Sequence, residues 1–355
     1  MAGKIPSTMR GVVATRFGQP SEVLEMREDL QVPEPNVAKG EMLVRVLAMS
    51  LSPGDWRMLS GDTKFIKKPK AWPYVPGLDV CGVVEKVAPG QPFAVGDTII
   101  GTWEVFGVGG MAEYAVVKVK QAAKKPEEMS PVDAAALANS ASHALQVADA
   151  AKFTPGCRVL VLGGSGAVGS LVVQLAKNAG ASFIATTSTN KDIMISLGAD
   201  EVIDYTKEEW SSKSAFNLNK FDVVVDCAEG AAAWSKWEKV LKPRSLSGRW
   251  IAVVGGTWDI FLTRFTQFPS FLLQLFGRKL KASMTPWAPR YVLHLGYANG
   301  KSITKVLEAI NNGKMRVVVD ERGPFPFSAQ GAIDAFTVLK DRKAVGKLVL
   351  QVAET

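Results

Sequence analysis

The chain contains little cysteine and little histidine. Its 355 residues include three cysteines and two histidines. The cysteines, Cys81, Cys157 and Cys227, form no Cys-x-x-Cys pair. This spacing argues against a disulfide framework and against a structural zinc lobe. We therefore expect the protein to function in a reducing compartment, either the cytoplasm or another reducing compartment.

Long uniform runs are also missing from this sequence. The first ten residues have no apolar core of signal-peptide length, so we expect no cleavable targeting segment. The formal net charge is +8, but the lysines and arginines are scattered and form no long basic arm. Nucleic acid is therefore not expected as a partner, although the charge favours phosphate-bearing ligands and anionic lipid.

One segment partly resembles a membrane-binding sequence. Phe265–Phe276 is rich in aromatic residues and leucine, and a basic cluster at Arg278–Lys281 follows it. The segment is too short and too interrupted to span a bilayer. Three interpretations stay open: a helix buried in the fold or in a subunit interface, a lid over a substrate pocket, and a peripheral membrane contact.

The length of the chain favours two domains, because 355 residues exceed what one hydrophobic core usually supports. The first 125 residues or so have the short apolar runs and Gly/Pro punctuation of β-structure. From Ser130 onward, strand patterns alternate with helix patterns, which predicts a parallel, doubly wound sheet. Strand patterns return at Arg316–Val319 and Leu348–Leu350, with a helix pattern at Ala329–Lys340 between them.

A glycine-rich turn follows the strand pattern that ends at Leu162. It carries Gly-x-Gly-x-x-Gly at Gly164, Gly166 and Gly169, and a helix pattern begins near Val168. Such a turn is tight, lets the backbone approach a pyrophosphate, and points the N-terminus of a helix at the phosphates. We predict that these residues bind a dinucleotide: Gly163, Gly164, Ser165, Gly166, Ala167 and Val168.

The next strand pattern, Ser182–Thr186, indicates which dinucleotide is bound. An Asp or Glu at the end of this strand normally accepts the ribose hydroxyls of NAD, and none is present. Thr187, Ser188 and Lys191 offer hydroxyls and a cation to an extra phosphate instead, which predicts NADPH. Asp192 is interpreted as a first-turn residue that compensates a helix dipole.

The order of several motifs resembles the medium-chain dehydrogenase/reductase superfamily. Within it, the chain is most similar to zinc-independent quinone oxidoreductases of the reticulon-interacting and chloroplast-envelope branch. The matching stretches are Val32–Pro35, Gly40–Val46, Pro76–Val84, Gly96–Gly101, Ala112–Val116, Gly163–Gly169, Leu197–Tyr205 and Gly346–Leu350.

This resemblance implies an α/β fold in which a GroES-like, β-rich substrate domain accompanies a doubly wound Rossmann domain. The implied boundaries are residues 1–129 and 289–355 for the discontinuous substrate domain and 130–288 for the Rossmann domain. A homodimer is also implied. Along the cofactor, the resemblance adds Tyr205 at the 2′-phosphate, and Ala228, Gly255 and Gly256 beside the ribose and nicotinamide.

Zinc is not expected at the catalytic site, because the zinc-dependent relatives need thiolate or imidazole ligands. The position of their Gly-His-Glu motif is Gly77-Leu78-Asp79 in this sequence. No cysteine occurs near Ser52–Asp55, where the family's Asn-Pro-x-Asp motif is matched. No metal ligand is therefore predicted.

Three departures from the family define the candidate catalytic residues. Ser52 replaces the motif's Asn, and is either a hydrogen-bonding group for a ligand or a turn former. Arg57 stands where several relatives carry tyrosine, and His143 where the family commonly has a threonine that meets nicotinamide. A histidine there can donate a proton near neutral pH. Candidate pocket walls, each with core packing as the alternative, are Trp56, Tyr74 and Trp103.

Taken together, these features predict an NADPH-dependent enzyme that transfers hydride to a quinone or an α,β-unsaturated carbonyl. The cofactor performs most of such chemistry, which leaves the protein to position the acceptor. One alternative is an enoyl-thioester reductase or an alcohol dehydrogenase-like enzyme. Another is a noncatalytic NADPH-binding protein that docks on membrane or on a partner.

Overall fold

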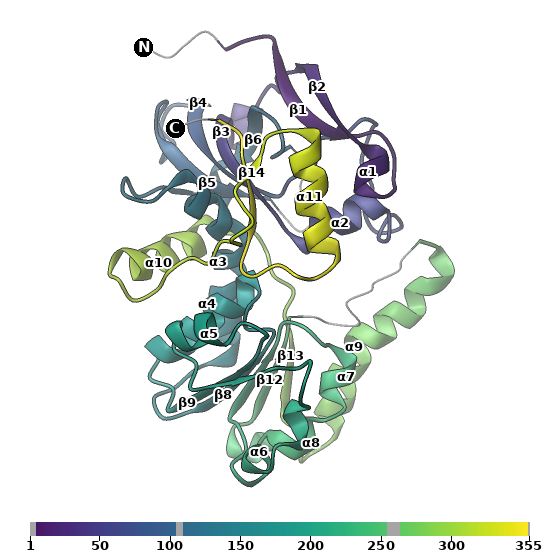
Figure 1. Cartoon of the computed structure of the whole chain (residues 1–355), viewed down its shortest axis with the longest axis vertical. Coiled ribbons are helices and arrows are strands. Elements are labelled where there is room, and N and C mark those ends of the chain that lie inside the picture. Colours follow the sequence, from purple (N-terminus) through teal and green to yellow (C-terminus); the bar gives the residue numbers. More distant parts are fainter. Residues whose placement is uncertain (1–4, 104–108, 254–262, 354–355) are drawn as a thin grey trace. The chain divides into compact units, whose positions relative to one another are not determined.

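A computed structural model describes residues 5–103, 109–253 and 263–353 (Figure 1). The chain divides into two compact units. Unit 1 comprises Met1–Ser142, Tyr297–Asn311 and Val317–Thr355, and unit 2 comprises His143–Gly296 and Asn312–Arg316. The predicted positions Gly255 and Gly256 lie outside the described residues.

Unit 1 is built around a largely antiparallel sheet with the strand order β14-β15-β3-β4-β5-β7, and β6 pairs with β3. A separate hairpin is formed by β1 and β2. The strands are β1 (Thr8–Ala14), β2 (Leu24–Gln31), β3 (Glu41–Leu51), β4 (Asp79–Lys86), β5 (Thr98–Thr102), β6 (Tyr114–Lys118), β7 (Ala122–Lys124), β14 (Phe325–Pro326) and β15 (Leu348–Gln351). The helices are α1 (Pro20–Val23), α2 (Pro53–Ser60), α10 (Gly300–Asn311) and α11 (Ala329–Lys340).

Unit 1 is assembled from both ends of the chain. β15 pairs antiparallel with β3, so that Leu348 lies opposite Leu51 and Leu350 opposite Met49. Composition left open whether the two ends meet, and this pairing shows that they share one sheet. The strand predicted at Arg316–Val319, however, does not form. Only an isolated bridge from Val319 to Lys347 forms there, because the strand that pairs with β15 beyond Lys347 is β14.

Unit 2 is a six-stranded parallel sheet with the order β10-β9-β8-β11-β12-β13. Successive strands are added first on one side of β8 and then, from β11 onward, on its other side, as in doubly wound folds. The strands are β8 (Arg158–Leu162), β9 (Phe183–Thr187), β10 (Glu201–Ile203), β11 (Val223–Asp226), β12 (Arg249–Ala252) and β13 (Arg290–Leu293). The helices are α4 (Ala167–Asn178), α5 (Lys191–Ser196), α6 (Ser214–Leu218), α7 (Ala231–Trp234), α8 (Trp237–Val240) and α9 (Phe268–Met284).

The edges of the two units differ from the implied domain boundaries. Helix α3 (Pro131–Ala151) crosses from unit 1 into unit 2 at His143. The implied break at residue 289 places β13 with the substrate domain, but β13 pairs with β12 and belongs to the sheet of unit 2. The partner of a strand therefore decides its unit here, and sequence patterns do not reveal that partner.

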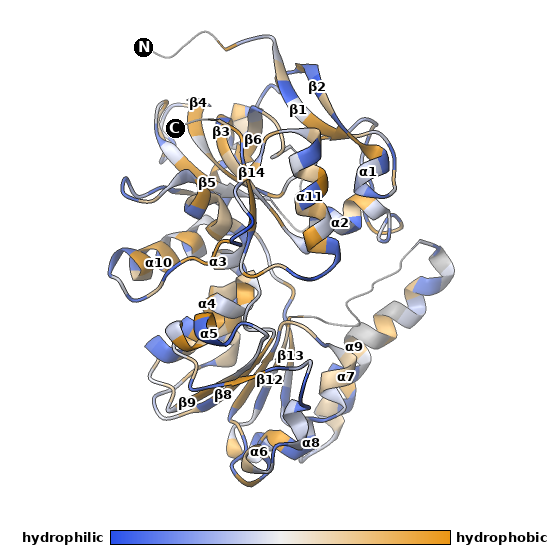
Figure 2. Ribbon diagram, in the orientation of Figure 1, coloured by the Kyte–Doolittle hydropathy of each residue, from blue (hydrophilic) through white to orange (hydrophobic). Residues whose placement is uncertain are grey.

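Each unit has its own apolar core, and hydrophobic residues run along the strands of its sheet (Figure 2). In unit 1, Val44 and Met49 of β3 pack in one buried cluster with Phe336 of α11. In unit 2, Leu160 of β8 shares a buried cluster with Trp250 of β12. Within the ranges listed above, no helix is both long and apolar enough to cross a membrane.

Candidate cofactor and catalytic sites

The glycine turn of unit 2 has the geometry of a dinucleotide cradle. Gly163 has a φ of +78°, which favours glycine. A Cβ on Gly164 would lie 2.0 Å from Thr186 Oγ1, and a Cβ on Gly169 would lie 2.2 Å from the Gly163 carbonyl oxygen. Side chains at these positions would therefore force the turn away from β9, and α4 away from the turn.

The turn leads directly into the N-terminus of α4. Its N-cap is Gly166, and no side chain caps the first turn of the helix. The first N–H groups of a helix have no partner within the helix, and their partial positive charge attracts anions. These residues fit a pyrophosphate group, and the half-buried Ser165, Ala167 and Val168 leave its approach partly open.

The end of β9 supports the same turn. Thr187 accepts hydrogen bonds from the Gly163 N–H at its hydroxyl (2.8 Å) and from the Gly164 N–H at its carbonyl (3.1 Å). The Ser188 hydroxyl accepts from the Asn190 N–H at 2.9 Å. Thr187, predicted to contact a phosphate, therefore also fixes the glycine turn.

The other residues predicted at the adenosine end lie along the same edge of the sheet. Lys191 is exposed at the start of α5, and Tyr205 is exposed two residues after β10. The Ser188 N–H donates to the Ile203 carbonyl at 2.9 Å, which holds these two segments together. Ala228 adjoins the turn as well, because a Cβ on Gly163 would come 2.8 Å from its Cβ.

The carboxyl end of β11 is shaped by Asp226. Its buried carboxylate accepts from the N–H groups of Ala228 (3.1 Å), Glu229 (2.8 Å) and Gly230 (2.7 Å). Burial raises the pKa of Asp226 to about 7, and the three backbone donors act against this rise. Asp226 thus holds the loop that carries Ala228 beside the glycine turn.

His143 meets the other histidine of the chain. His143 Nδ1 lies 3.1 Å from His294 Nε2, and the two rings meet edge to face with centroids 5.2 Å apart. Gly296 leaves room for them, since a Cβ there would lie 2.2 Å from the His143 ring. Burial, reinforced by His143, lowers the pKa of His294 to about 4, so that His294 is neutral at pH 7.

His294 was not predicted as a site residue. It directly follows β13, at the carboxyl edge of the sheet where ligands bind in doubly wound folds. That position, together with the scarcity of histidine, was the available signal.

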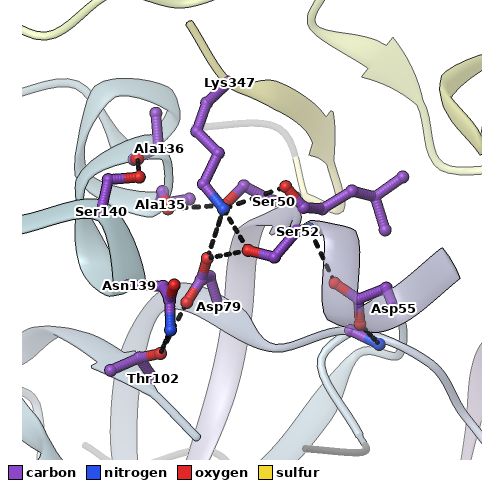
Figure 3. Close-up of polar contacts among 12 residues, drawn as sticks. Ser50, Ser52, Asp55, Asp79, Thr102, Ala135, Ala136, Asn139, Ser140 and Lys347 are labelled. Atoms are coloured by element: carbon purple, nitrogen blue, oxygen red, sulfur yellow. Dashed lines mark hydrogen bonds and ion pairs between the residues drawn. The ribbon is translucent and has the colours of Figure 1, made fainter. Parts of the chain in front are cut away.

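A buried polar cluster in unit 1 surrounds Ser52 (Figure 3). Lys347 Nζ lies 2.7 Å from Asp79 Oδ2, and both side chains are almost completely buried. The same ammonium donates to the Ser52 hydroxyl and to the Leu51 carbonyl. Thr102 donates to Asp79 Oδ1 at 2.7 Å, and Ser50 donates to Asp79 Oδ2 at 3.2 Å.

These contacts bear on the prediction for Ser52. Its hydroxyl faces Lys347 and Asp79, and its backbone N–H donates to Asp55 Oδ2 at 2.8 Å in a capping box at the start of α2. Asp55 also accepts from the Gly77 N–H, and burial raises the pKa of its carboxyl group to about 7. Ser52 therefore makes structural contacts through both its backbone and its hydroxyl, and a contact with ligand stays a prediction.

The same cluster is a poor fit to catalytic zinc. At the position of the family's zinc motif, the Asp79 carboxylate is neutralised by an ammonium rather than left for a metal ion. Among the described side chains, no group of three or more His, Cys, Asp and Glu residues is arranged to hold a metal. Zinc also needs thiolate or imidazole ligands here, and none belongs to this cluster.

The remaining predicted residues of unit 1 lie in or near its core. Trp103 packs against the core cluster and donates from Nε1 to the Val116 carbonyl at 3.1 Å. Trp56 also packs against that cluster, and Arg57 is half-buried in the last turn of α2. Tyr74 differs, because no group in the described chain pairs with its buried hydroxyl. A buried hydroxyl of this kind normally meets water or a ligand.

Comparison with known proteins places the chain in a family. Residues 38–127 match the alcohol dehydrogenase GroES-like domain, and residues 197–350 match the zinc-binding dehydrogenase domain. The NADPH-dependent alkenal/one oxidoreductase, chloroplastic, of Arabidopsis thaliana is 33% identical over 98% of this chain and 80% of its own length. The chain belongs to the medium-chain dehydrogenase/reductase superfamily.

Two further relatives lie within the superfamily's quinone oxidoreductases. The chloroplast envelope quinone oxidoreductase homolog of Arabidopsis thaliana is 30% identical over 99% of this chain and all of its own length. The solved structure of the quinone oxidoreductase from Coxiella burnetii superposes with a TM-score of 0.77 at 25% identity, covering 98% of this chain and 100% of that one. The predicted α/β fold and family are thus confirmed.

The buried ion pair yields a prediction for stability. Replacement of Lys347 by Met should lower the free energy of unfolding by about 3–5 kcal/mol, because the Asp79 carboxylate stays buried without its cation. The double variant Lys347→Met/Asp79→Asn should recover much of this loss, since no net charge is then buried. Urea-induced unfolding measures both effects.

Lys343→Met is the matched control. Lys343 pairs with Asp341 at 3.5 Å on the surface, with 70% of its side chain exposed, so its loss should change stability by less than about 1 kcal/mol. An equal effect of Lys343→Met and Lys347→Met would show that the buried pair has no special importance.

Proposed function

We propose that this protein is an NADPH-dependent reductase of quinones or of the double bond of α,β-unsaturated carbonyl compounds. One combination of features carries this proposal. The glycine turn at Gly163–Gly169 leads into a helix, α4, whose N-terminus has no side-chain cap, and the end of β9 carries hydroxyl side chains and no carboxylate. The names of the relatives, an alkenal/one oxidoreductase and quinone oxidoreductases, support the acceptor class.

When bound, NADPH supplies the hydride. The residues proposed to hold its pyrophosphate are Gly163, Gly164, Ser165, Gly166, Ala167 and Val168. Ser188 and Lys191 are proposed to bind the 2′-phosphate, with Thr187 and Tyr205 beside them. Ala228, Gly255 and Gly256 remain proposed contacts for the ribose and nicotinamide.

In this proposal, the substrate domain contributes position rather than metal chemistry. Zinc-independent action is favoured because Lys347 neutralises Asp79. Tyr74 is the best supported of the three proposed pocket walls, because its buried hydroxyl has no protein partner in the described chain. Trp56, Trp103 and Arg57 stay proposals that rest on the family resemblance.

The prediction for activity concerns NADPH oxidation, followed by absorbance, with a panel of quinones and enones. We expect turnover with NADPH and much weaker turnover with NADH. If only an enoyl-thioester is reduced, the protein is an enoyl-thioester reductase instead. Tight NADPH binding without turnover on any acceptor would favour the noncatalytic alternative.

Lys191 gives a second prediction, for cofactor choice. A charge-assisted hydrogen bond contributes roughly 1.5–3 kcal/mol. Because Lys191 is exposed, we take the low end of this range, so that Lys191→Gln should raise the KM for NADPH by about 10-fold. The KM for NADH should not change, because NADH has no 2′-phosphate. Lys239→Gln, at another exposed lysine of unit 2, is the control. Equal effects on both cofactors would remove Lys191 from the phosphate site.

The histidine pair gives a third prediction. We propose that His143 donates the proton that the acceptor needs after hydride addition, and that His294 orients the His143 ring through the 3.1 Å contact at Nδ1. His143→Gln should lower kcat by about 100-fold, in the range of general acid catalysis.

The positioning part is tested with His294→Gln. This change should lower kcat less than His143→Gln and should shift the pH profile of kcat, because a glutamine does not reproduce the imidazole contact with His143 Nδ1. A rise in KM with an unchanged kcat in both variants would assign the pair to packing.

Two further features stay proposals. A homodimer is supported by the outer edge of β13, which has no strand partner among the described residues of its sheet. A reducing compartment is supported by cysteine usage, and the chloroplast named for the alkenal/one oxidoreductase is one such place to examine.

A further inference from the structure

Helix α9 carries a row of exposed apolar side chains. Leu273, Phe276, Leu280 and Met284 are exposed by 73%, 46%, 63% and 75%. Their spacings of three, four and four residues place them on one face of the helix. Trp287, exposed by 63%, follows the helix. We call these five residues the α9 stripe.

The opposite face of α9 attaches the helix to unit 2. Ala282, two positions after Leu280, is only 3% exposed and packs in the buried cluster that contains Tyr291 of β13. Figure 1 shows α9 beside β13. Because one face of the helix is held by the sheet, the stripe on the other face is presented to the surroundings.

Cations flank the stripe. Lys279 and Lys281 are exposed, and the helix geometry places them on either side of the apolar row. The sequence from Thr263 to Arg290 contains no Asp or Glu. Single exposed leucines, such as Leu218 and Leu246 elsewhere in unit 2, need no explanation, but a continuous apolar row between cations indicates a partner.

The charges also discriminate between possible partners. A second copy that covered the stripe with its own stripe would bring the same lysines toward each other, with no carboxylate in the segment to neutralise them. Like charges brought together in this way disfavour association. A surface that combines an apolar interior with anionic groups at its boundary matches both the stripe and the lysines.

We propose that α9 docks this protein on the surface of an anionic lipid bilayer. The helix lies in the plane of the interface, with the stripe among the acyl chains near the headgroups. Lys279 and Lys281 extend their aliphatic stems along the apolar surface and bring their ammonium groups to lipid phosphates. Docking of this kind does not depend on the reaction proposed above.

The test is flotation of the full chain with phosphatidylcholine vesicles that contain or lack phosphatidylglycerol. We expect binding to the anionic vesicles at low salt, weaker binding at high salt, and much weaker binding to vesicles of phosphatidylcholine alone. Absence of binding to anionic vesicles at low salt would overturn the proposal.

Paired variants locate the contact. At about 1 kcal/mol for each cation near the surface, Lys279→Gln/Lys281→Gln should weaken binding to anionic vesicles roughly 30-fold. Leu273→Ser/Leu280→Ser should weaken it by about 100-fold or more, because two leucine side chains no longer enter the interface.

Matched controls remove the same groups elsewhere. Lys67→Gln/Lys68→Gln changes the net charge equally at two exposed lysines of unit 1, and Leu218→Ser/Leu246→Ser removes two exposed leucines of unit 2. Neither control should alter vesicle binding by more than about 3-fold, because both pairs lie outside α9 and distant charges are screened by salt. Equal losses in controls and α9 variants would refute docking through α9. A change of oligomeric state in the α9 variants, with vesicle binding retained, would assign the stripe to a second copy.

Discussion

The buried ion pair between Lys347 and Asp79 ties the C-terminal strand of unit 1 to the strands made early in the chain. Lys347 precedes the last strand of the chain, whereas Asp79 begins β4, and the ammonium also bonds to the end of β3 at Leu51. A carboxylate buried at this depth is unfavourable without a cation. The pair therefore links three strands at one point and fixes the position of Ser52 and of the start of α2.

Much of this architecture could be predicted from the sequence, because local patterns determine it. The helix pattern recognised at Ala329–Lys340, for example, coincides with α11. The glycine turn between β8 and α4 was recognisable as well, since its geometry requires glycine at fixed spacing. Such features are set by residues close together in the chain.

The parts that were not predicted depend on contacts between distant residues. Lys347 stood within a recognised motif, but its partner is 268 residues away, and no local pattern links a lysine to a particular aspartate. His294 is likewise 151 residues from His143. The strand expected at Arg316–Val319 was wrong for a similar reason, because an apolar run forms a strand only where a neighbouring strand has a free edge.

The pairing of β15 with β3 has a consequence for the order of events during synthesis. β3 leaves the ribosome early but has to wait for β15, and every strand of unit 2 is made in between. Domains usually fold as units in the order in which they emerge. Here the sheet of unit 2 is complete while the sheet of unit 1, begun before it, still lacks β14 and β15. The first domain to start is the last to finish, and it has a folded neighbour when it does so.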